Sequence, residues 1–180
     1  CYVDYIDSDW YVLHVTVSQN EGEDRQGFLN FYYDGVSASV VIDQEGKKVP
    51  VTTEHAGTLE DPYSAADAIA VASTLSWTGS KDYEKTDDVY VKGVITSIVE
   101  SFGSTYGNAS FYIADSEEAT STFYAYRVLY FGQQKWAEGN KQIAVGDEGI
   151  IYGPLMNYKG NTPETVAGVN YVYSINGETE

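Results

Sequence analysis

The sequence predicts an all-β chain: a partial antiparallel β-sandwich, followed by a five-stranded barrel with one α-helix before it. Two observations lead to this prediction. Val, Ile, Thr and Tyr dominate the periodic stretches, with Tyr at 17 of 180 residues, and these residue types favour strands. Turns rich in Gly and Asp separate the short alternating stretches, as in antiparallel sheets. We expect a sandwich module at residues 1–47, a linker at 48–60 and the barrel domain at 61–177.

The first 47 residues alternate as short strands. Strands are expected at residues 11–18, 27–33 and 37–44, with a tight turn at Asp34-Gly35. This spacing is typical of a small antiparallel sandwich. Pro50 and Gly57 then interrupt the periodicity, which predicts the linker.

One helix is predicted before the barrel. It would begin at Asp61-Pro62, because the first helical turn tolerates a residue without an N–H. Ser64 and Asp67 resemble a capping pair. A face of small residues is expected to pack on the barrel: Ala65, Ala66, Ile69, Ala70, Ala72, Ser73 and Leu75.

Residues 89–177 have the layout of a five-stranded barrel of the OB type. The first strand, at 89–99, contains Gly93, where a strand shared by two sheets must bend. A strand at 110–116 follows a Gly-Asn turn, a later strand contains Gly153, and residues 171–177 close the series. An OB barrel binds through one outer face and two loops and has no built-in chemistry.

The net charge of −17 disfavours nucleic acid and anionic membranes as partners. Affinity for nucleic acid depends largely on Lys and Arg that neutralise phosphates. Residues 58–180 contain seven Lys and Arg against seventeen Asp and Glu, so the expected barrel is itself acidic.

Cys1 is the only cysteine, so no disulfide is expected within the chain. Two interpretations of Cys1 compete: the lipid-bearing first residue of a processed bacterial lipoprotein, or a strand residue at an arbitrary start. The second is favoured because no flexible tether follows. No apolar run is long enough to cross a membrane.

The residue inventory indicates a protein that is not an enzyme. Nucleophilic catalysis needs a histidine beside the nucleophile. His14 is expected within a strand and His55 solvated in the linker. No catalytic residue, cofactor or zinc site is therefore predicted. Calcium at Asp82, Asp87 and Asp88, or at Asp4, Asp7 and Asp9, is a minority alternative.

The aromatic residues of the second and third barrel strands form the candidate ligand site. If Phe111 and Ile113 point into the barrel, Tyr112 points outward. On the next strand, Tyr124, Tyr126 and Tyr130 would share one face, and Phe123, Ala125, Arg127 and Leu129 the other. With loop residues added, the candidate set is Tyr106, Tyr112, Tyr124, Tyr126, Arg127, Tyr158 and Lys159. The alternative is that these rings simply pack beneath the segment that contains Trp136.

Two resemblances point to secreted proteins of Bacteroidetes. Asn20, Gly22 and Arg25, the strand that begins at Phe28 and the ending V-V-I-D-Q-E-G resemble the C-terminal part of a BACON domain. Residues 57–177, with V-Y-V-K-G-V-I, Y-G-N-A-S-F-Y-I-A-D and Y-G-P-L-M-N-Y-K-G, resemble the OB-fold modules of surface lipoproteins of the same bacteria.

These resemblances imply an extracytoplasmic location, secreted, periplasmic or at the outer-membrane surface. They imply a binding or spacer module and bring no enzyme site. We expect a glycan or another surface protein as partner, with single-stranded nucleic acid the weaker alternative.

Overall fold

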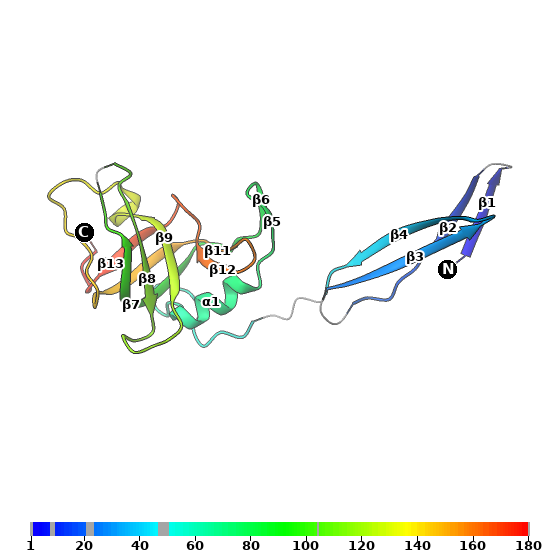
Figure 1. Ribbon diagram of the computed structural model, residues 1–180. Helices are drawn as coiled ribbons and strands as arrows, with labels where there is room; N and C mark the ends of the chain where they lie inside the picture. Colours follow the sequence, from blue (N-terminus) through cyan, green and yellow to red (C-terminus); the bar gives the residue numbers. More distant parts are fainter. Residues whose placement is uncertain (1, 8–9, 21–23, 47–50, 104, 180) are drawn as a thin grey trace. The chain divides into compact units, whose positions relative to one another are not determined.

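The computed structural model describes residues 2–7, 10–20, 24–46, 51–103 and 105–179. The chain divides into two compact units, Cys1–Pro50 and Val51–Glu180 (Figure 1). Most of its regular structure is in strands, so the all-β prediction is confirmed.

The described residues of the first unit form two antiparallel hairpins. β1 (Tyr2–Asp7) pairs with β2 (Trp10–His14), and β3 (Arg25–Tyr33) pairs with β4 (Val36–Gln44). The turn at Asp34-Gly35 lies where it was predicted, and both residues have the left-handed φ of a type I′ turn. The strand expected at 11–18 is wrong in its second half, because β2 ends at His14.

The second unit begins with a segment that packs along its first long strand. The backbone N–H of Tyr90 donates to the carbonyl of Gly57 at 2.9 Å, and that of Glu54 donates to Asp67 at 2.9 Å. Much of the expected linker at 48–60 is therefore bonded into this unit.

The helix α1 (Ala65–Ser73) begins later than predicted. Ser64 is its N-cap, and the predicted pair of Ser64 and Asp67 forms a capping box. The Asp115 carboxylate also accepts from the N–H of Ala65 at 2.6 Å. The face expected to be buried is partly wrong, because Ala66 is exposed. Ala65 and Ala72 are buried as predicted, and Ala68, which was not predicted, is buried with them.

Among the described residues, the other elements of this unit are strands and one 3₁₀ turn. In chain order they are β5 (Trp77–Gly79), β6 (Asp82–Tyr83), β7 (Val89–Glu100), β8 (Asn108–Ala114), β9 (Phe123–Leu129), η1 (Phe131–Gln133), β10 (Glu148–Gly153), β11 (Leu155–Tyr158), β12 (Thr162–Thr165) and β13 (Tyr171–Ile175).

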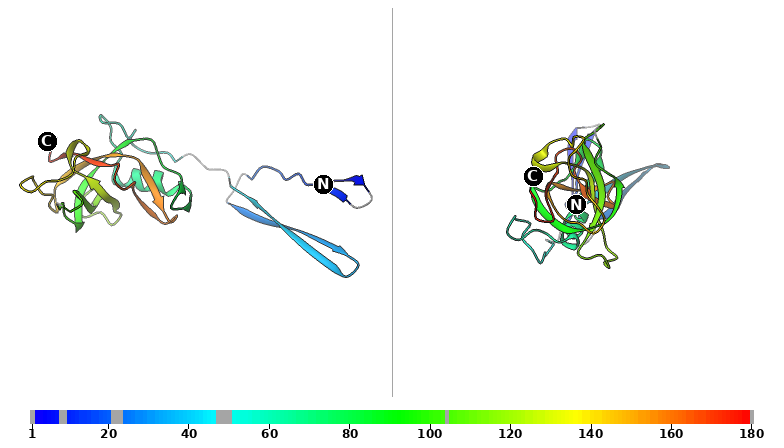
Figure 2. Two further views of the ribbon diagram at one scale, coloured as in Figure 1. Left: turned by 90° about the horizontal axis from the view of Figure 1, so that it is seen from above. Right: turned by 90° about the vertical axis from the view of Figure 1, so that its left-hand side faces the viewer.

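Five of these strands pair in a closed order. β7 pairs with β8, β8 with β9, β9 with β13 in parallel, β13 with β10, and β10 with β7 again. The β11–β12 hairpin joins β9 through a parallel bridge between Glu164 and Tyr124. Figure 2 shows these strands curling around a common interior.

Fully buried side chains from every strand of this ring fill the interior: Val91, Ile95, Phe111, Ile113, Phe123, Val128, Ile151 and Val172. Gly93 lies where β7 passes closest to β8. A Cβ atom there would lie 2.8 Å from the carbonyl oxygen of Ala114, so this position needs glycine.

Candidate functional site

Three tyrosines on β8 and β9 form a continuous row of ring contacts on the outer surface. The Tyr112 and Tyr124 rings stack with centroids 4.6 Å apart and planes inclined by 18°. Tyr126 continues the row with its centroid 5.4 Å from that of Tyr124. Phe111 and Ile113 are fully buried, so the predicted outward direction of Tyr112 is confirmed.

Arg127 also belongs to this row, and the predicted direction of its side chain is wrong. Its φ of 48° interrupts the alternation of β9, and the register with β8 shifts nearby, between Ala109 and Phe111. Val128 therefore takes the buried position expected for Arg127. The Arg127 guanidinium carbon lies 5.2 Å from the centroid of the Tyr126 ring, a cation–π contact. We call Tyr112, Tyr124, Tyr126 and Arg127 the tyrosine row.

The stacking determines what the row offers to a ligand. Rings 4.6 Å apart and nearly parallel cover each other's faces, so they present edges and hydroxyl groups along the row. Desolvation raises the pKa of Tyr124, and the neighbouring Tyr112 and Glu164 raise it further. The phenol is therefore neutral at physiological pH and both donates and accepts hydrogen bonds.

Glu164 is a buried neighbour of the row that sequence reasoning missed. It is the cross-strand partner of Tyr124 on β12 and is only 5% exposed. Desolvation raises its pKa to about 7. Glu164 lies in a segment for which no strand was predicted, so nothing in the sequence placed it beside Tyr124.

The three loop residues of the candidate set lie apart from the row. Tyr158 packs edge-on against Trp77 at 4.8 Å, and the Lys159 ammonium lies 5.1 Å from the centre of the Tyr158 ring. Tyr106 is 65% exposed and makes no ring contact with any residue that the structure describes. The structure thus brings together four of the seven predicted residues.

A second tyrosine cluster, which sequence reasoning also missed, lies on β7, β10 and β13. Tyr90 packs against Tyr152 at 4.5 Å and against Tyr173 at 5.2 Å, and Tyr152 packs against Tyr171 at 5.4 Å. The strand register aligns Tyr90, Tyr152 and Tyr171 as cross-strand neighbours. Only this register, which no local pattern specifies, would have revealed the cluster.

The His55 side chain is 39% exposed, as the predicted solvation requires, and it also has a carboxylate partner that was not predicted. Its Nδ1 lies 2.7 Å from the Asp67 carboxylate, which also accepts from the Ser64 hydroxyl at 3.1 Å. This hydrogen bond raises the pKa of His55. Burial opposes ionisation of Asp67, yet the hydrogen bonds from Glu54, His55 and Ser64 lower its pKa. The Ser64 hydroxyl accepts from the backbone N–H of Asp67 in the first turn of α1, so Ser64, Asp67 and His55 together form a helix cap.

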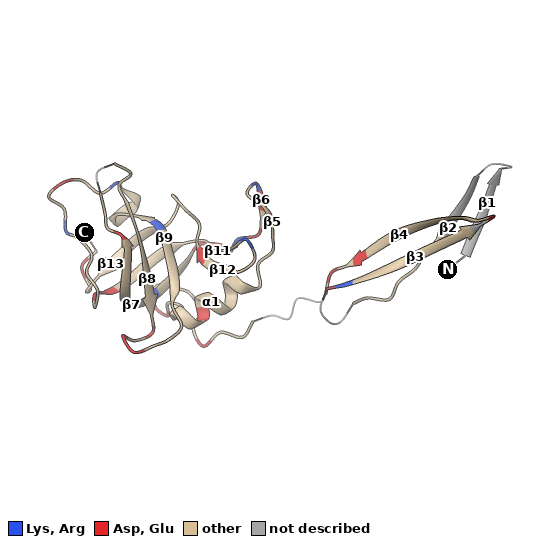
Figure 3. Cartoon of the chain, in the orientation of Figure 1, with Lys and Arg blue, Asp and Glu red and all other residues tan. Residues whose placement is uncertain are grey.

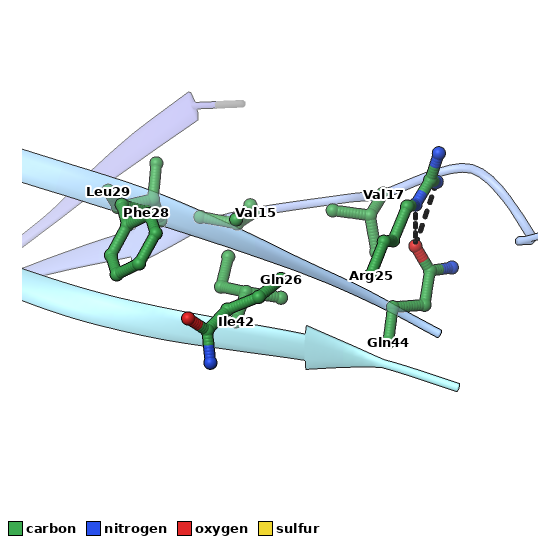
Figure 4. Close-up of a pocket in the computed structure, with 9 residues that line it drawn as sticks. Val15, Val17, Arg25, Gln26, Phe28, Leu29, Ile42 and Gln44 are labelled. Atoms are coloured by element: carbon green, nitrogen blue, oxygen red, sulfur yellow. Dashed lines mark hydrogen bonds between the residues drawn. The ribbon is translucent and has the colours of Figure 1, made fainter. Parts of the chain in front are cut away.

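The first unit carries an apolar groove beside β3 (Figure 4). Its cavity of about 240 Å³ is lined by apolar side chains that include Val15, Val17, Phe28 and Ile42. At one end Arg25 donates to the side-chain oxygen of Gln44 at 2.8 and 3.0 Å.

Charged groups gather in no basic strip within the described ranges (Figure 3). Lys92 and Lys141 pair with Glu148 and Glu178 at 3.1 and 2.8 Å.

Among the residues that the structure places, no three His, Cys, Asp or Glu side chains are grouped to hold a metal. Asp82 bonds the Thr78 hydroxyl, and the side chains of Asp4, Asp7 and Asp9 lie outside the described part. No described helix is long and apolar enough to span a bilayer.

Comparison with models of known protein families gave no match, and comparisons with curated proteins and with solved structures gave none either.

Proposed function

We propose that this chain is a non-enzymatic module of a secreted or surface-anchored bacterial protein, and that it binds a neutral glycan along the tyrosine row. In this proposal the five-strand ring is an OB-type barrel, and the first unit is the C-terminal part of a BACON-like sandwich. The pairing order supports the barrel assignment, because an OB barrel closes its first strand onto the second and the fourth.

The position of the row carries the functional proposal. β8 and β9 are the second and third strands of the ring, and these strands form the ligand face of OB barrels. The row there combines three phenol hydroxyls with a guanidinium that is held against the last ring. Sugars bind through such combinations of hydroxyl, planar donor and aromatic ring, with no need for a basic groove.

Charge favours a neutral glycan over nucleic acid. Arg127 is the one basic side chain in the row, and a strand of phosphates needs several. The net charge of −17 would repel a polyanion before it reached the row.

A second candidate function, contact with another protein, is favoured by the β3–β4 hairpin. It exposes apolar side chains that include Phe28 at 61%, Val36 at 71% and Val40 at 51%. Val36 and Val40 lie on one face of the hairpin and Phe28 on the other, and exposed apolar side chains of this kind are typical of protein contacts.

Native electrophoresis through gels that contain neutral polysaccharides tests the glycan proposal. The charge of the chain carries it quickly through the gel, so retardation is easily measured. We expect at least one polysaccharide to retard the wild type and Tyr126→Ala to restore its mobility. The matched control is Tyr32→Ala, which removes a tyrosine that is 79% exposed on the first unit. Retardation that Tyr126→Ala leaves unchanged would contradict the proposal.

A further inference from the structure

A second hollow lies beyond the end of β9, on residues outside the tyrosine row. Its volume is about 450 Å³, and it is lined by Tyr130, Phe131, Gly132, Gln134, Asn140 and Thr179. These residues come from the η1 turn, the following loop and the C-terminal turn after β13. No ionisable group other than the Tyr130 phenol is among them.

The polar side chains that line the hollow are exposed to solvent and are not paired with protein groups. Within the described part of the chain, the side chains of Gln134, Asn140 and Thr179 make no hydrogen bond. The neighbouring Gln133 contrasts with them, because its amide donates to the carbonyl of Val169 at 3.0 Å. The two amides and the hydroxyl can therefore each donate and accept a hydrogen bond to a ligand in the hollow.

Aromatic rings form the apolar side of the hollow. Tyr130 packs at nearly a right angle against Phe102, with centroids 5.2 Å apart, and against Phe131 at 4.7 Å. Phe102 and Phe131 are buried, so they fix the Tyr130 ring from behind. A rigid ring beside free amides suits a ligand with apolar C–H faces and hydroxyl edges.

An ion pair connects the two rims that carry Asn140 and Thr179. Lys141, next to Asn140, binds Glu178, next to Thr179, at 2.8 Å. The Trp136 indole N–H also donates to the Lys141 carbonyl at 3.1 Å. The η1 side is held by the Tyr130 N–H, which donates to the Gln134 carbonyl at 2.9 Å.

We propose that this hollow binds a terminal residue of a neutral saccharide. The neutral donor and acceptor set matches sugar hydroxyls, which each donate and accept. A charged ligand would leave its charge without a partner among these residues. The volume also exceeds that of a single water site by far, so one pyranose ring fits. Lys141 and Glu178 act as positioning residues that hold the rims.

Titration of the ¹⁵N-labelled chain with four methyl glycosides, of glucose, galactose, mannose and N-acetylglucosamine, tests this proposal by heteronuclear NMR. We expect the side-chain amide signals of Gln134 and Asn140 to shift saturably with at least one glycoside. Glycerol, a polyol without a ring, should cause no saturable shift. The spectrum itself reports whether each variant is folded.

Variants separate this site from the tyrosine row. Asn140→Ala should weaken glycoside binding about three- to tenfold, the usual effect of one lost neutral hydrogen bond. Tyr126→Ala should leave it unchanged, so failure of the row and failure of the hollow are distinguishable. Asn161→Ala, an exposed asparagine on the β11–β12 turn, is the matched control.

Lys141→Met tests the positioning role, because it breaks the ion pair and keeps the apolar stem. We expect weaker binding with the Gln134 signal still responding. Absence of a saturable shift with all four glycosides, or equal shifts in the wild type and Asn140→Ala, would overturn the proposal.

Discussion

Glu164 on β12 lies directly opposite Tyr124 on β9, in the parallel bridge that joins the β11–β12 hairpin to the ring. The carboxyl is nearly buried at 5% exposure, and desolvation raises its pKa to about 7 from 4.5. Its charge would disfavour both its own burial and ionisation of the Tyr124 phenol beside it. The protonation state of Glu164 is therefore coupled to folding and to the tyrosine row.

Glu164→Gln should stabilise the chain at alkaline pH. A carboxyl whose folded pKa is raised holds its proton longer in the folded state, so stability falls as pH rises from 4.5 through 7. The neutral amide removes this loss. We expect a gain of about 1–3 kcal/mol at about pH 8 and little change at about pH 4.

Urea unfolding of both proteins at the two pH values measures this effect. The matched control is Glu148→Gln, a carboxyl that is exposed beside Lys92. An equal destabilisation of Glu164→Gln at both pH values would show that the carboxyl acts through hydrogen bonds, contrary to this account.

Local sequence signals predicted much of the second unit. The positions of its main strands along the chain and the cap formed by Ser64 and Asp67 depend on neighbouring residues, and both are observed. The start of α1 was placed too early because Pro62 lies before the cap. Its buried face was partly misplaced because tertiary packing selects Ala68 over Ala66.

The candidate site was predictable only along single strands. Alternation gave the outward direction of Tyr112, Tyr124 and Tyr126, but the left-handed backbone at Arg127 reverses alternation without any local signal. Glu164 and the cluster around Tyr152 depend on which strands pair, in a register that only the folded chain specifies.

Arg127→Gly should weaken glycan binding while changing the stability of the chain only slightly. The φ of 48° is unfavourable for arginine and accessible to glycine, whereas loss of the cation–π contact opposes this gain. We expect a stability within about 1 kcal/mol of the wild type, and weaker glycan binding. Arg127→Val should instead destabilise by about 1–2 kcal/mol or more, because a β-branched residue resists this conformation.

Thermal unfolding compares these two variants. Equal unfolding temperatures for the valine and glycine variants would show that residue 127 does not have a left-handed backbone. The broken alternation of β9 would then need another cause.

His55→Gln should remove a pH-dependent contribution to stability. The pKa of His55 is raised above 6.5, so its stabilising pair with Asp67 is present below that pH and is lost as pH rises through the raised value. The pKa of Asp67 is lowered below 3.8, so the contribution is also lost as pH falls through that lower value.

We therefore expect the stability difference between the wild type and His55→Gln to be larger at about pH 5.5 than at about pH 8.5. Chemical unfolding at both pH values measures it. His14→Gln, in the first unit, is the control. A difference that grows with pH would have the opposite sign and would refute the assigned pairing.

Glycan binding by two double variants distinguishes the tyrosine row from the tyrosine cluster on β7, β10 and β13. Tyr112→Ala/Tyr126→Ala disrupts the row, and Tyr90→Ala/Tyr171→Ala disrupts the tyrosine cluster on β7, β10 and β13. The dissociation constant is measured for a polysaccharide that retards the wild type. We expect affinity to fall roughly 10- to 100-fold in the first variant and about twofold or less in the second. Equal loss in both variants, or no retardation of the wild type by any neutral polysaccharide, would contradict the proposal that the tyrosine row binds a glycan.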